Sequence, residues 1–318
     1  MSRHNWRTRV VAIGLLIVLF STAMSHGSAA LAKTIFHATH NTHASPGSLG
    51  TLHPGVAVVS IEPYMPYVGA QNGRLTGLDG DIMTALAQRL HLKVQIFQSD
   101  FPGQLAAVQS HRVDVAIGSI GWTKERAKVG LFTDPTYYAP TVVSERKGQN
   151  ITRLDQMAGK TVCTITGYLY IPALQDIPGA TLRTYPTSAN MYEDISNGRC
   201  DVGFSDALLN IYMALHSPHF HLTFKYLTPP TARDVAAHPL YSRFEKAELC
   251  FYIPPQEPQF ERALTAGIRA FYKSGLEARL LKKWGADPVS WLRPPSRVAK
   301  DRIGVDRPTG WTPPSWKP

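Results

Sequence analysis

The chain has 318 residues, 44% of them hydrophobic and 18% charged, with 24 glycines, 24 prolines and three cysteines. This length suffices for two domains with a hydrophobic core, and the composition excludes a disordered chain, a coiled coil and a disulfide-stapled scaffold. The net charge of +10 comes from scattered Lys and Arg residues, with no basic run longer than Lys282-Lys283, so nucleic-acid binding is not expected.

The N-terminus has the order of a secretory signal peptide. Three arginines precede an apolar run over residues 10–20, and Ala30-Leu31-Ala32 offers an A-x-A cleavage site. The apolar run is too short to span a bilayer. The alternative interpretation is an N-terminal anchor that is not cleaved. No cysteine lies near the cleavage site. We therefore expect residues 1–32 to be removed from an exported protein that carries no lipid anchor.

Residues 33–52 are rich in Ala, His, Ser, Thr and Gly, and we interpret them as a tether. His37, His40 and His43 recur at every third position, a spacing that also occurs in metal-binding tracts, but a solvated linker is the simpler interpretation. No C-x-x-C pair occurs in the chain. Neither a metal site nor a cofactor is expected in the folded part.

From Gly55 onward the pattern alternates between strands and helices. Hydrophobic spacing predicts an amphipathic helix that opens at Gly80-Asp81 and a short helix over residues 104–110. Six short apolar or alternating segments are predicted as strands: 56–60, 93–97, 113–118, 161–165, 181–185 and 200–204. Two half-chains of this kind predict an α/β protein with two lobes, each a mostly parallel sheet flanked by helices.

Two further helices are predicted near the C-terminus. Apolar residues recur at helical spacing over 260–271, the pattern breaks at Lys273-Ser274-Gly275, and a second helical face follows up to Trp284. After Gly285 the chain becomes rich in proline. Because proline interrupts helices and strands, residues 291–318 are expected to form a tail without regular secondary structure.

Candidate site residues should follow the ends of the strands. In open α/β sheets, ligands bind beyond the carboxyl ends of the parallel strands. The segments 118–121 and 204–206 follow predicted strands in the two half-chains. Asp114 and Asp201, at the starts of buried strands, are predicted to be structural.

Four segments between residues 53 and 290 carry the motifs of one protein family. They are Tyr64-Met65-Pro66-Tyr67, residues 73–81 (G-x-x-x-G-L-D-x-D), residues 114–135 (D-V…T-x-x-R…F-T-x-P) and residues 275–284 (G-x-x-x-x-L-x-x-K-W). Each motif alone is weak, but the four occur in order and at matching separations. The chain in this respect resembles the family 3 periplasmic solute-binding proteins, which serve amino-acid ABC importers.

The resemblance implies a two-lobe periplasmic-binding-protein fold of type II, which closes on its ligand by a hinge. The two hinge strands would lie near Pro140-Thr141-Val142 and Leu249-Cys250-Phe251. Lobe 1 would comprise residues 53–140 and 249–290, and lobe 2 residues 141–248. The resemblance also implies a periplasmic monomer that captures a free amino acid, or a similar small carboxylate, and delivers it to the membrane permease of an ABC importer.

A free amino acid carries a carboxylate and an ammonium, so a dry cleft must supply a fixed cation and a fixed anion. Arg126 is similar to the family's carboxylate clamp, because a guanidinium fork matches a carboxylate, and Thr123 is placed to cap its turn. A surface arginine is the alternative. Asp206, on the other lobe, would accept hydrogen bonds from the ammonium, while a plain helix N-cap would also explain an aspartate at this position.

The other expected ligand contacts are aromatic walls and backbone groups. Flat rings pack the apolar body of a ligand, and backbone amides near a helix N-terminus suit an anion. The candidates are Tyr64 and Phe101 as walls, with core packing as the alternative for Phe101, and Ser119, Gly121, Gly167 and Tyr168 as donors of backbone groups.

Three positions depart from the family pattern. Gly121 stands where many members carry Ser or Thr, Ile61 where several carry Asp, and Ile165 where some carry a polar or cationic residue. These changes predict a ligand with an apolar or small side chain, although the carboxyl of Glu62 is adjacent.

Two further alternatives follow from the same residues. Cys163 and Cys200 lie on predicted neighbouring strands, either as a disulfide or as two buried thiols, with Cys250 left free.

The protein is expected to be a binding protein and not an enzyme. Cyclohexadienyl dehydratases resemble the family, however, and such an enzyme would need a general acid, for which only Glu62 and Asp206 are at hand. An accessory or sensory binding protein without a transport role is the third interpretation.

Overall fold

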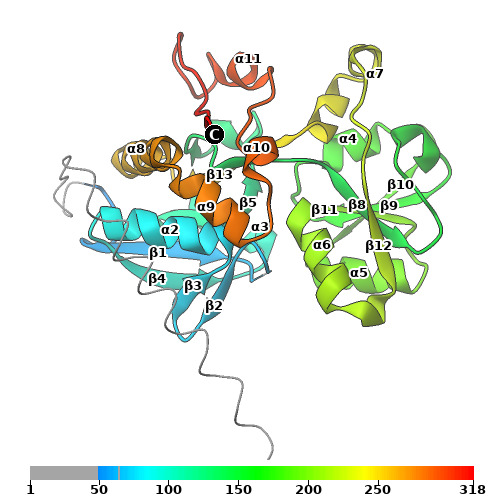
Figure 1. Ribbon diagram of the computed structural model, residues 1–318, viewed down its shortest axis with the longest axis horizontal. Helices are drawn as coiled ribbons and strands as arrows, with labels where there is room; N and C mark the ends of the chain where they lie inside the picture. Colours follow the sequence, from blue (N-terminus) through cyan, green and yellow to red (C-terminus); the bar gives the residue numbers. More distant parts are fainter. Residues whose placement is uncertain (1–48, 64) are drawn as a thin grey trace, which may run out of the picture. The chain divides into compact units, whose positions relative to one another are not determined.

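The computed structural model describes residues 49–318 except Tyr64, within one compact unit, Ala44–Pro318 (Figure 1). The predicted signal peptide, the histidine tract and Tyr64 lie outside the described residues. Residues 49–52, which the sequence assigned to the tether, are packed: Leu49 is 2% exposed, and the Leu52 amide donates to Asp114 Oδ1 (2.6 Å). The folded body therefore begins before residue 53.

The first sheet has the order β4-β1-β5-β13-β6, with β7 also paired to β13. β1 is parallel to β4 and β5, whereas β13 is antiparallel to β5, β6 and β7. The strands are β1 (Val56–Ile61), β4 (Lys93–Gln98), β5 (Val115–Gly121), β6 (Leu131–Phe132), β7 (Tyr137–Ala139) and β13 (Ala247–Ile253).

Helices and a hairpin surround this sheet. They are the hairpin β2 (Gly69–Gln71) and β3 (Arg74–Thr76), and the helices α2 (Leu78–Arg89), α3 (Phe101–Gln109), η2 (Arg126–Lys128), α8 (Pro258–Ser274) and α9 (Leu276–Lys283). α2 packs with α8 and α9, while α3 packs on β1 and β5 (Figure 1). We call this part lobe 1.

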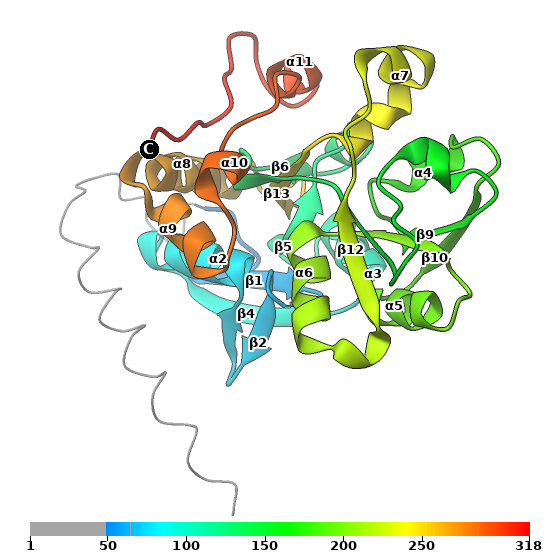
Figure 2. The same ribbon diagram turned by 45° about the vertical axis from the view of Figure 1, so that its right-hand side comes forward.

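The second sheet has the order β10-β9-β11-β8-β12, in which β9, β10 and β11 are parallel and β8 is antiparallel to its neighbours. Its strands are β8 (Val142–Arg146), β9 (Thr161–Ile165), β10 (Thr181–Tyr185), β11 (Val202–Ser205) and β12 (Leu222–Tyr226). The helices of this part, lobe 2, are η3 (Leu154–Met157), α4 (Ile171–Gln175), α5 (Ser188–Ser196), α6 (Ala207–His216), η4 (Pro218–Phe220), α7 (Ala232–Ala237) and η5 (Pro239–Phe244). Figure 2 shows α5 and α6 beside the β12 strand.

The chain crosses between the sheets twice. The first crossing is Pro140-Thr141, between β7 and β8, and the second is Glu245-Lys246, directly before β13. The residues predicted for the second crossing lie instead inside β13, where Leu249 pairs with Gly121 and Tyr137. Because these residues are buried on both faces of the sheet, they belong to lobe 1. The predicted two-lobe α/β fold is confirmed, but both sheets are mixed and not mostly parallel, and the two crossings are short irregular segments and not strands.

The sequence motifs hold lobe 1 together. Asp81, in the first turn of α2, accepts hydrogen bonds from Lys283 Nζ and from Trp284 Nε1, both at 2.7 Å, so the D-x-D and K-W motifs meet. Gly77 adopts a φ of 95°, and a Cβ there would lie 2.4 Å from the Tyr67 carbonyl oxygen. Only glycine fits this close approach. These motif residues fix where α2 meets the end of α9 and the segment at Tyr67.

The proline-rich segment is only in part the irregular tail that the sequence predicted: residues 303–318 form no helix or extended strand, but helices precede them. It contains α10 (Pro288–Trp291) and α11 (Val298–Arg302), and Val298 and Arg302 are fully buried. The helices form because proline is tolerated in a first helical turn, as in α10, and because no proline falls inside α11.

The cysteines resolve one of the open alternatives. Cys163, on β9, and Cys200, just before β11, form a disulfide with a Cα–Cα distance of 6.3 Å, and Cys250 is a buried free thiol. The bond joins two neighbouring parallel strands of lobe 2.

Among the described helices, none combines the length and the apolar character needed to cross a membrane.

Candidate functional site

Contacts join all the described residues among the predicted ligand-binding set. From lobe 1 come Phe101, Ser119, Gly121 and Arg126, and from lobe 2 come Gly167, Tyr168 and Asp206. Each touches at least one other member across the two lobes or within its own lobe. The remaining predicted residue, Tyr64, is outside the described part of the chain.

Arg126 is the cation of this site. It is 9% exposed, its Nη1 donates to the Gly121 carbonyl oxygen (2.6 Å), and its Nη2 donates to the Gly167 carbonyl oxygen of lobe 2. The Thr123 hydroxyl accepts from the Arg126 amide (3.1 Å), as its spacing predicted. Burial lowers the pKa of Arg126 to about 10, so the guanidinium is still charged at neutral pH. The surface-arginine alternative is therefore wrong.

Asp206 is the opposing anion. It precedes α6 in extended conformation, but its side chain caps no amide of that helix. Its carboxylate instead accepts from the Ser119 hydroxyl (2.6 Å) of lobe 1 and from the Tyr168 hydroxyl (2.9 Å). Burial raises the pKa of Asp206 to about 6, and the positive charge of Arg126 opposes this rise. Asp206 is thus aimed at lobe 1 and not at its own helix.

The Phe101 ring lies against the cation and packs on the ring of Tyr168. Phe101 is 3% exposed and packs edge-to-face on Tyr168, with centroids 5.0 Å apart. The Arg126 guanidinium carbon lies 5.2 Å from the Phe101 centroid, within the range of a cation–π interaction. Phe101 therefore belongs to the hydrophobic core and to the site together.

The backbone groups differ from those predicted. The Ser119 amide donates to Asp79 Oδ2 (2.6 Å), and the Tyr168 amide donates to the Ile165 carbonyl (3.0 Å). Gly121 and Gly167 present carbonyl oxygens to Arg126. The prediction of donated amides is therefore wrong for Ser119 and Tyr168, because turn and strand-end contacts already use these groups.

Asp79 is a functional-site residue that the sequence reasoning left out. Its carboxylate accepts from the amides of Gly118 (3.0 Å) and Ser119, and from the Tyr137 hydroxyl (2.7 Å). Ser119 has a φ of 57°, an unusual conformation that these bonds stabilise. Burial raises the pKa of Asp79 to about 6. The D-x-D motif was the available signal, since its first aspartate holds the end of β5.

Leu169 explains the unusual glycine of the site. A Cβ at residue 121 would lie 2.2 Å from Leu169 Cδ2, well inside van der Waals contact. The Ser or Thr that many family members carry at this position would require the Leu169 side chain to shift. No local pattern in the sequence indicates this pair, because the two residues come from different lobes.

Glu62 adds a second carboxyl near Asp206. It is 6% exposed, and burial raises its pKa to about 7, with the charges of Asp206 and Asp100 acting in the same direction. No other described residue forms a hydrogen bond with its carboxyl. The site therefore combines one buried cation with a buried carboxyl on lobe 1 and a partly buried carboxyl on lobe 2, which suits a small molecule that carries both charges.

Comparisons with known proteins show which proteins the chain is similar to. The model of the bacterial extracellular solute-binding proteins, family 3, matches residues 56–287. The probable amino-acid-binding protein YxeM of Bacillus subtilis (strain 168) is 27% identical over 205 residues, which are 63% of this chain and 70% of that protein. The L-cystine-binding protein TcyJ of Escherichia coli (strain K12) is 30% identical over 159 residues, 48% of this chain and 60% of that protein.

Solved structures show the same fold. An ancestral arginine-binding protein bound to arginine superposes with a TM-score of 0.63 at 22% identity, over 73% of this chain and 99% of that one. The ancestral amino-acid-binding protein AncCDT-1, a precursor of cyclohexadienyl dehydratase, gives a TM-score of 0.60 at 23% identity, over 72% and 95% of the two chains. Since the family model covers most of the sequence and the fold agrees, the chain belongs to the bacterial extracellular solute-binding proteins, family 3.

Proposed function

We propose that the protein captures a free amino acid, or a similar small carboxylate, between its lobes and delivers it to the permease of an ABC importer. One observation carries the proposal: a buried guanidinium from lobe 1 and a partly buried carboxyl from lobe 2, those of Arg126 and Asp206, both contact the end of β5. The family of the chain and the amino-acid-binding relatives support it. We further propose that the protein works as a periplasmic monomer.

In the proposed complex, Arg126 binds the α-carboxylate and Asp206 binds the α-ammonium. A guanidinium has five N–H groups, and the bonds to Gly121 and Gly167 use two of them, which leaves three for a bidentate carboxylate contact. Asp206 faces the same strand end through Ser119. Phe101 and Tyr168, with Tyr64, would enclose the apolar body of the ligand. The two charges then hold the lobes together.

The ligand side chain is proposed to be apolar or small. Ile61 and Ile165 are fully buried and bring no charge to the site. Glu62, with a pKa raised to about 7, is largely neutral below that pH and does not demand a cationic partner there.

Isothermal titration calorimetry and thermal shift with leucine, phenylalanine, lysine and arginine test this function. We expect leucine or phenylalanine to bind and to raise the melting temperature, because a ligand that binds only the native state stabilises it. Tight lysine binding alone would show that the side-chain preference is wrong. No response to any free amino acid would show that the capture function is wrong.

The carboxyl of Glu62 favours a second candidate, a dehydratase that resembles the cyclohexadienyl dehydratases. A buried acid with a pKa of about 7 can donate a proton to a departing hydroxyl group while the substrate carboxylate leaves as carbon dioxide. Incubation with prephenate, followed by the absorbance of phenylpyruvate, separates the two functions. Turnover in the wild type that Glu62→Gln abolishes would support the enzyme, and no turnover would support the binding protein.

A further inference from the structure

The C-terminal extension, residues 288–318, begins directly after the segment that the family model matches, yet it is tightly packed. Arg302 and Val298 are fully buried, and Leu292 is 1% exposed. In Figure 2 the extension, coloured orange to red, runs beside β6 and β13 of lobe 1. Its polar contacts lead to two places that matter for ligand capture: the turn that carries Arg126 and the second crossing.

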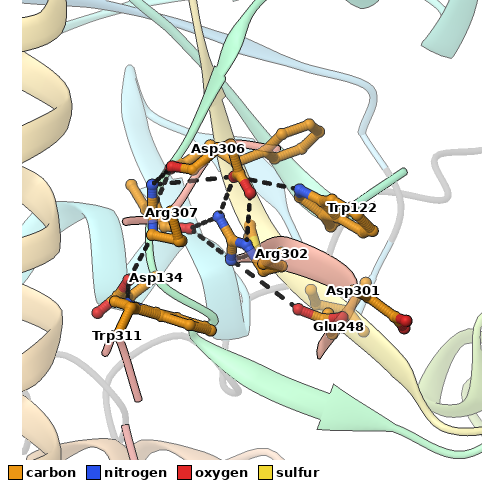
Figure 3. Close-up of polar contacts among 12 residues, drawn as sticks. Trp122, Asp134, Glu248, Asp301, Arg302, Asp306, Arg307 and Trp311 are labelled. Atoms are coloured by element: carbon orange, nitrogen blue, oxygen red, sulfur yellow. Dashed lines mark hydrogen bonds and ion pairs between the residues drawn. The ribbon is translucent and has the colours of Figure 1, made fainter. Parts of the chain in front are cut away.

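Arg302 is the centre of the first contact (Figure 3). Its guanidinium carbon lies 5.7 Å from the ring of Trp122 and 5.3 Å from the ring of Trp311. Its Nε donates to Asp306 Oδ1 (3.2 Å), and both Nη atoms donate to the Thr133 carbonyl oxygen (3.2 Å each). A fully buried guanidinium needs such partners, since an uncompensated buried charge is costly.

Trp122 is bound by the same cluster. Its indole Nε1 donates to Asp306 Oδ2 (3.2 Å), and its amide donates to the Glu248 carbonyl (2.9 Å). Trp122 is therefore held by hydrogen bonds at both its ring and its backbone, the first from the extension and the second from β13.

The position of Trp122 connects the extension to the ligand site. Trp122 stands between Gly121, whose carbonyl oxygen accepts from Arg126 Nη1, and Thr123, whose hydroxyl accepts from the Arg126 amide. A shift of Trp122 thus moves two groups that orient Arg126. Because productive contacts require placement within a fraction of an ångström, support of this kind changes affinity without touching the ligand.

The extension also forms hydrogen bonds with the second crossing, Glu245-Lys246. Arg297 Nε donates to Glu245 Oε2 (2.9 Å), Arg297 Nη2 donates to the Lys246 carbonyl (3.1 Å), and Lys246 Nζ donates to the Ser290 carbonyl (2.7 Å). Toward lobe 2, by contrast, a hollow of about 520 Å³ separates residues 297–305 from Leu240 and Arg243. The extension is thus fastened to lobe 1 and to the crossing, with open space on the side of lobe 2.

We propose that one part of the C-terminal extension supports the ligand site: through Asp306 and Arg302 it fixes Trp122, and with it the turn that presents Arg126 to the ligand. Asp306 is then a positioning residue. The proposal rests on the proposed role of Arg126 in ligand capture, but its structural step, the fixing of residues 121–126, can be measured without a ligand.

A matched pair of variants tests the proposal. Trp122→Phe and Trp311→Phe each keep a ring against Arg302, and each loses one indole hydrogen bond to an aspartate, Asp306 or Asp134. Asp306→Ala removes the contact from the side of the extension. Hydrogen exchange by mass spectrometry on the ligand-free protein should show faster exchange over residues 119–128 in Trp122→Phe and Asp306→Ala, and wild-type exchange there in Trp311→Phe.

Affinity gives the second readout, with the strongest binder among leucine, phenylalanine, lysine and arginine as the probe. We expect about tenfold weaker binding in Asp306→Ala, and no further loss when Trp122→Phe is added, because the Trp122–Asp306 hydrogen bond is already absent in Asp306→Ala. Trp311→Phe should bind like the wild type.

The inference is overturned if Asp306→Ala lowers only the melting temperature while exchange over 119–128 stays at the wild-type rate, since the extension would then be purely structural. Binding losses in the double variant that simply add would also overturn it, because Asp306 would not act through Trp122. If no amino acid binds the wild type, the proposed function fails, and the exchange measurement still decides this inference.

Discussion

At the scale of single residues, burial decides the chemistry of the site. Asp206, Glu62 and Asp79 have raised pKa values because each carboxyl is removed from water. Arg126 keeps its charge under the same burial. The ligand-free site therefore contains carboxyls whose ionised form is poorly stabilised, and a ligand ammonium supplies the missing positive charge.

Replacing Asp206 by asparagine should separate stability from binding. Its pKa in the folded protein, about 6, exceeds the ordinary value of 3.8, so its contribution to stability is fully present below about pH 4 and falls as the pH rises toward 6. Asp206→Asn should melt at a higher temperature than the wild type above pH 6. It should also lose the stabilisation by ligand, because the amide cannot balance an ammonium. Calorimetric melting at pH 5 and pH 8, with and without ligand, measures both effects, and a lower melting temperature for the variant at pH 8 would contradict the account.

Glu62 should tune the choice between neutral and cationic ligands. Its carboxyl ionises near pH 7, so the wild-type affinity for lysine relative to leucine should rise between pH 6 and pH 8. In Glu62→Gln, which keeps the shape but cannot ionise, this ratio should stay constant. Both ligands contact Asp206 through the α-ammonium group, so the titration of Asp206 changes both affinities equally and cancels in their ratio. Calorimetry at the two pH values gives the ratio. If the ratio changes equally in Glu62→Gln and in the wild type, Glu62 does not contact the ligand.

At the scale of elements, the candidate site residues lie at or near the ends of strands, and contacts between the two lobes bring them together. Asp79, in α2, accepts from the amides of residues 118 and 119 in β5, and the Leu169 side chain of lobe 2 lies against Gly121 at the end of that strand. Each of these contacts joins segments that are distant in the sequence.

Gly121→Ser should weaken ligand binding, since its Cβ would collide with Leu169 Cδ2 across the lobes. Overpacking of this kind costs about 1–3 kcal/mol, which corresponds to about a tenfold or greater loss of affinity. Adding Leu169→Ala should restore binding, and Leu169→Ala alone is the control. If the double variant binds no better than Gly121→Ser, the two residues do not meet when the ligand is held.

Removing the disulfide should destabilise lobe 2 and leave the charged site intact. The bond closes a loop of 37 residues, and replacing both cysteines by serine should lower the free energy of unfolding by about 2–4 kcal/mol. Urea unfolding measures this change, and calorimetry should give an unchanged affinity where the variant is folded. An affinity loss in fully folded protein would connect the disulfide to the site.

At the scale of the whole molecule, local patterns predicted the parallel core well. β1, β4, β9 and β10 lie within a residue of their predicted ranges, because a short apolar run between turn residues marks a buried strand by itself. β8 and β12 were not predicted as strands of lobe 2. Their place depends on antiparallel pairing with each other, over a separation of about eighty residues in the chain, which no local pattern reveals.

For the C-terminal extension and the candidate site, too, local sequence patterns could not predict the features that depend on tertiary contacts. Proline content predicted an irregular tail, yet α11 forms because Arg302 finds partners on Thr133 and Trp122, far away in the sequence. Motifs and resemblance located Arg126 and Asp206 correctly at one meeting point of the lobes. They did not indicate Leu169, or that the Ser119 amide is already used by Asp79, since both depend on tertiary contacts.

The central claim is that one zwitterion is held by Arg126 on lobe 1 and Asp206 on lobe 2. Calorimetry with the tightest-binding amino acid, its N-acetyl derivative and its C-terminal amide tests it directly, in the wild type, Arg126→Gln and Asp206→Asn. The account predicts that the wild type binds only the parent amino acid. It also predicts that Arg126→Gln loses selectivity against the amide, and that Asp206→Asn loses selectivity against the N-acetyl form. Equal wild-type affinity for the parent and either derivative would contradict it.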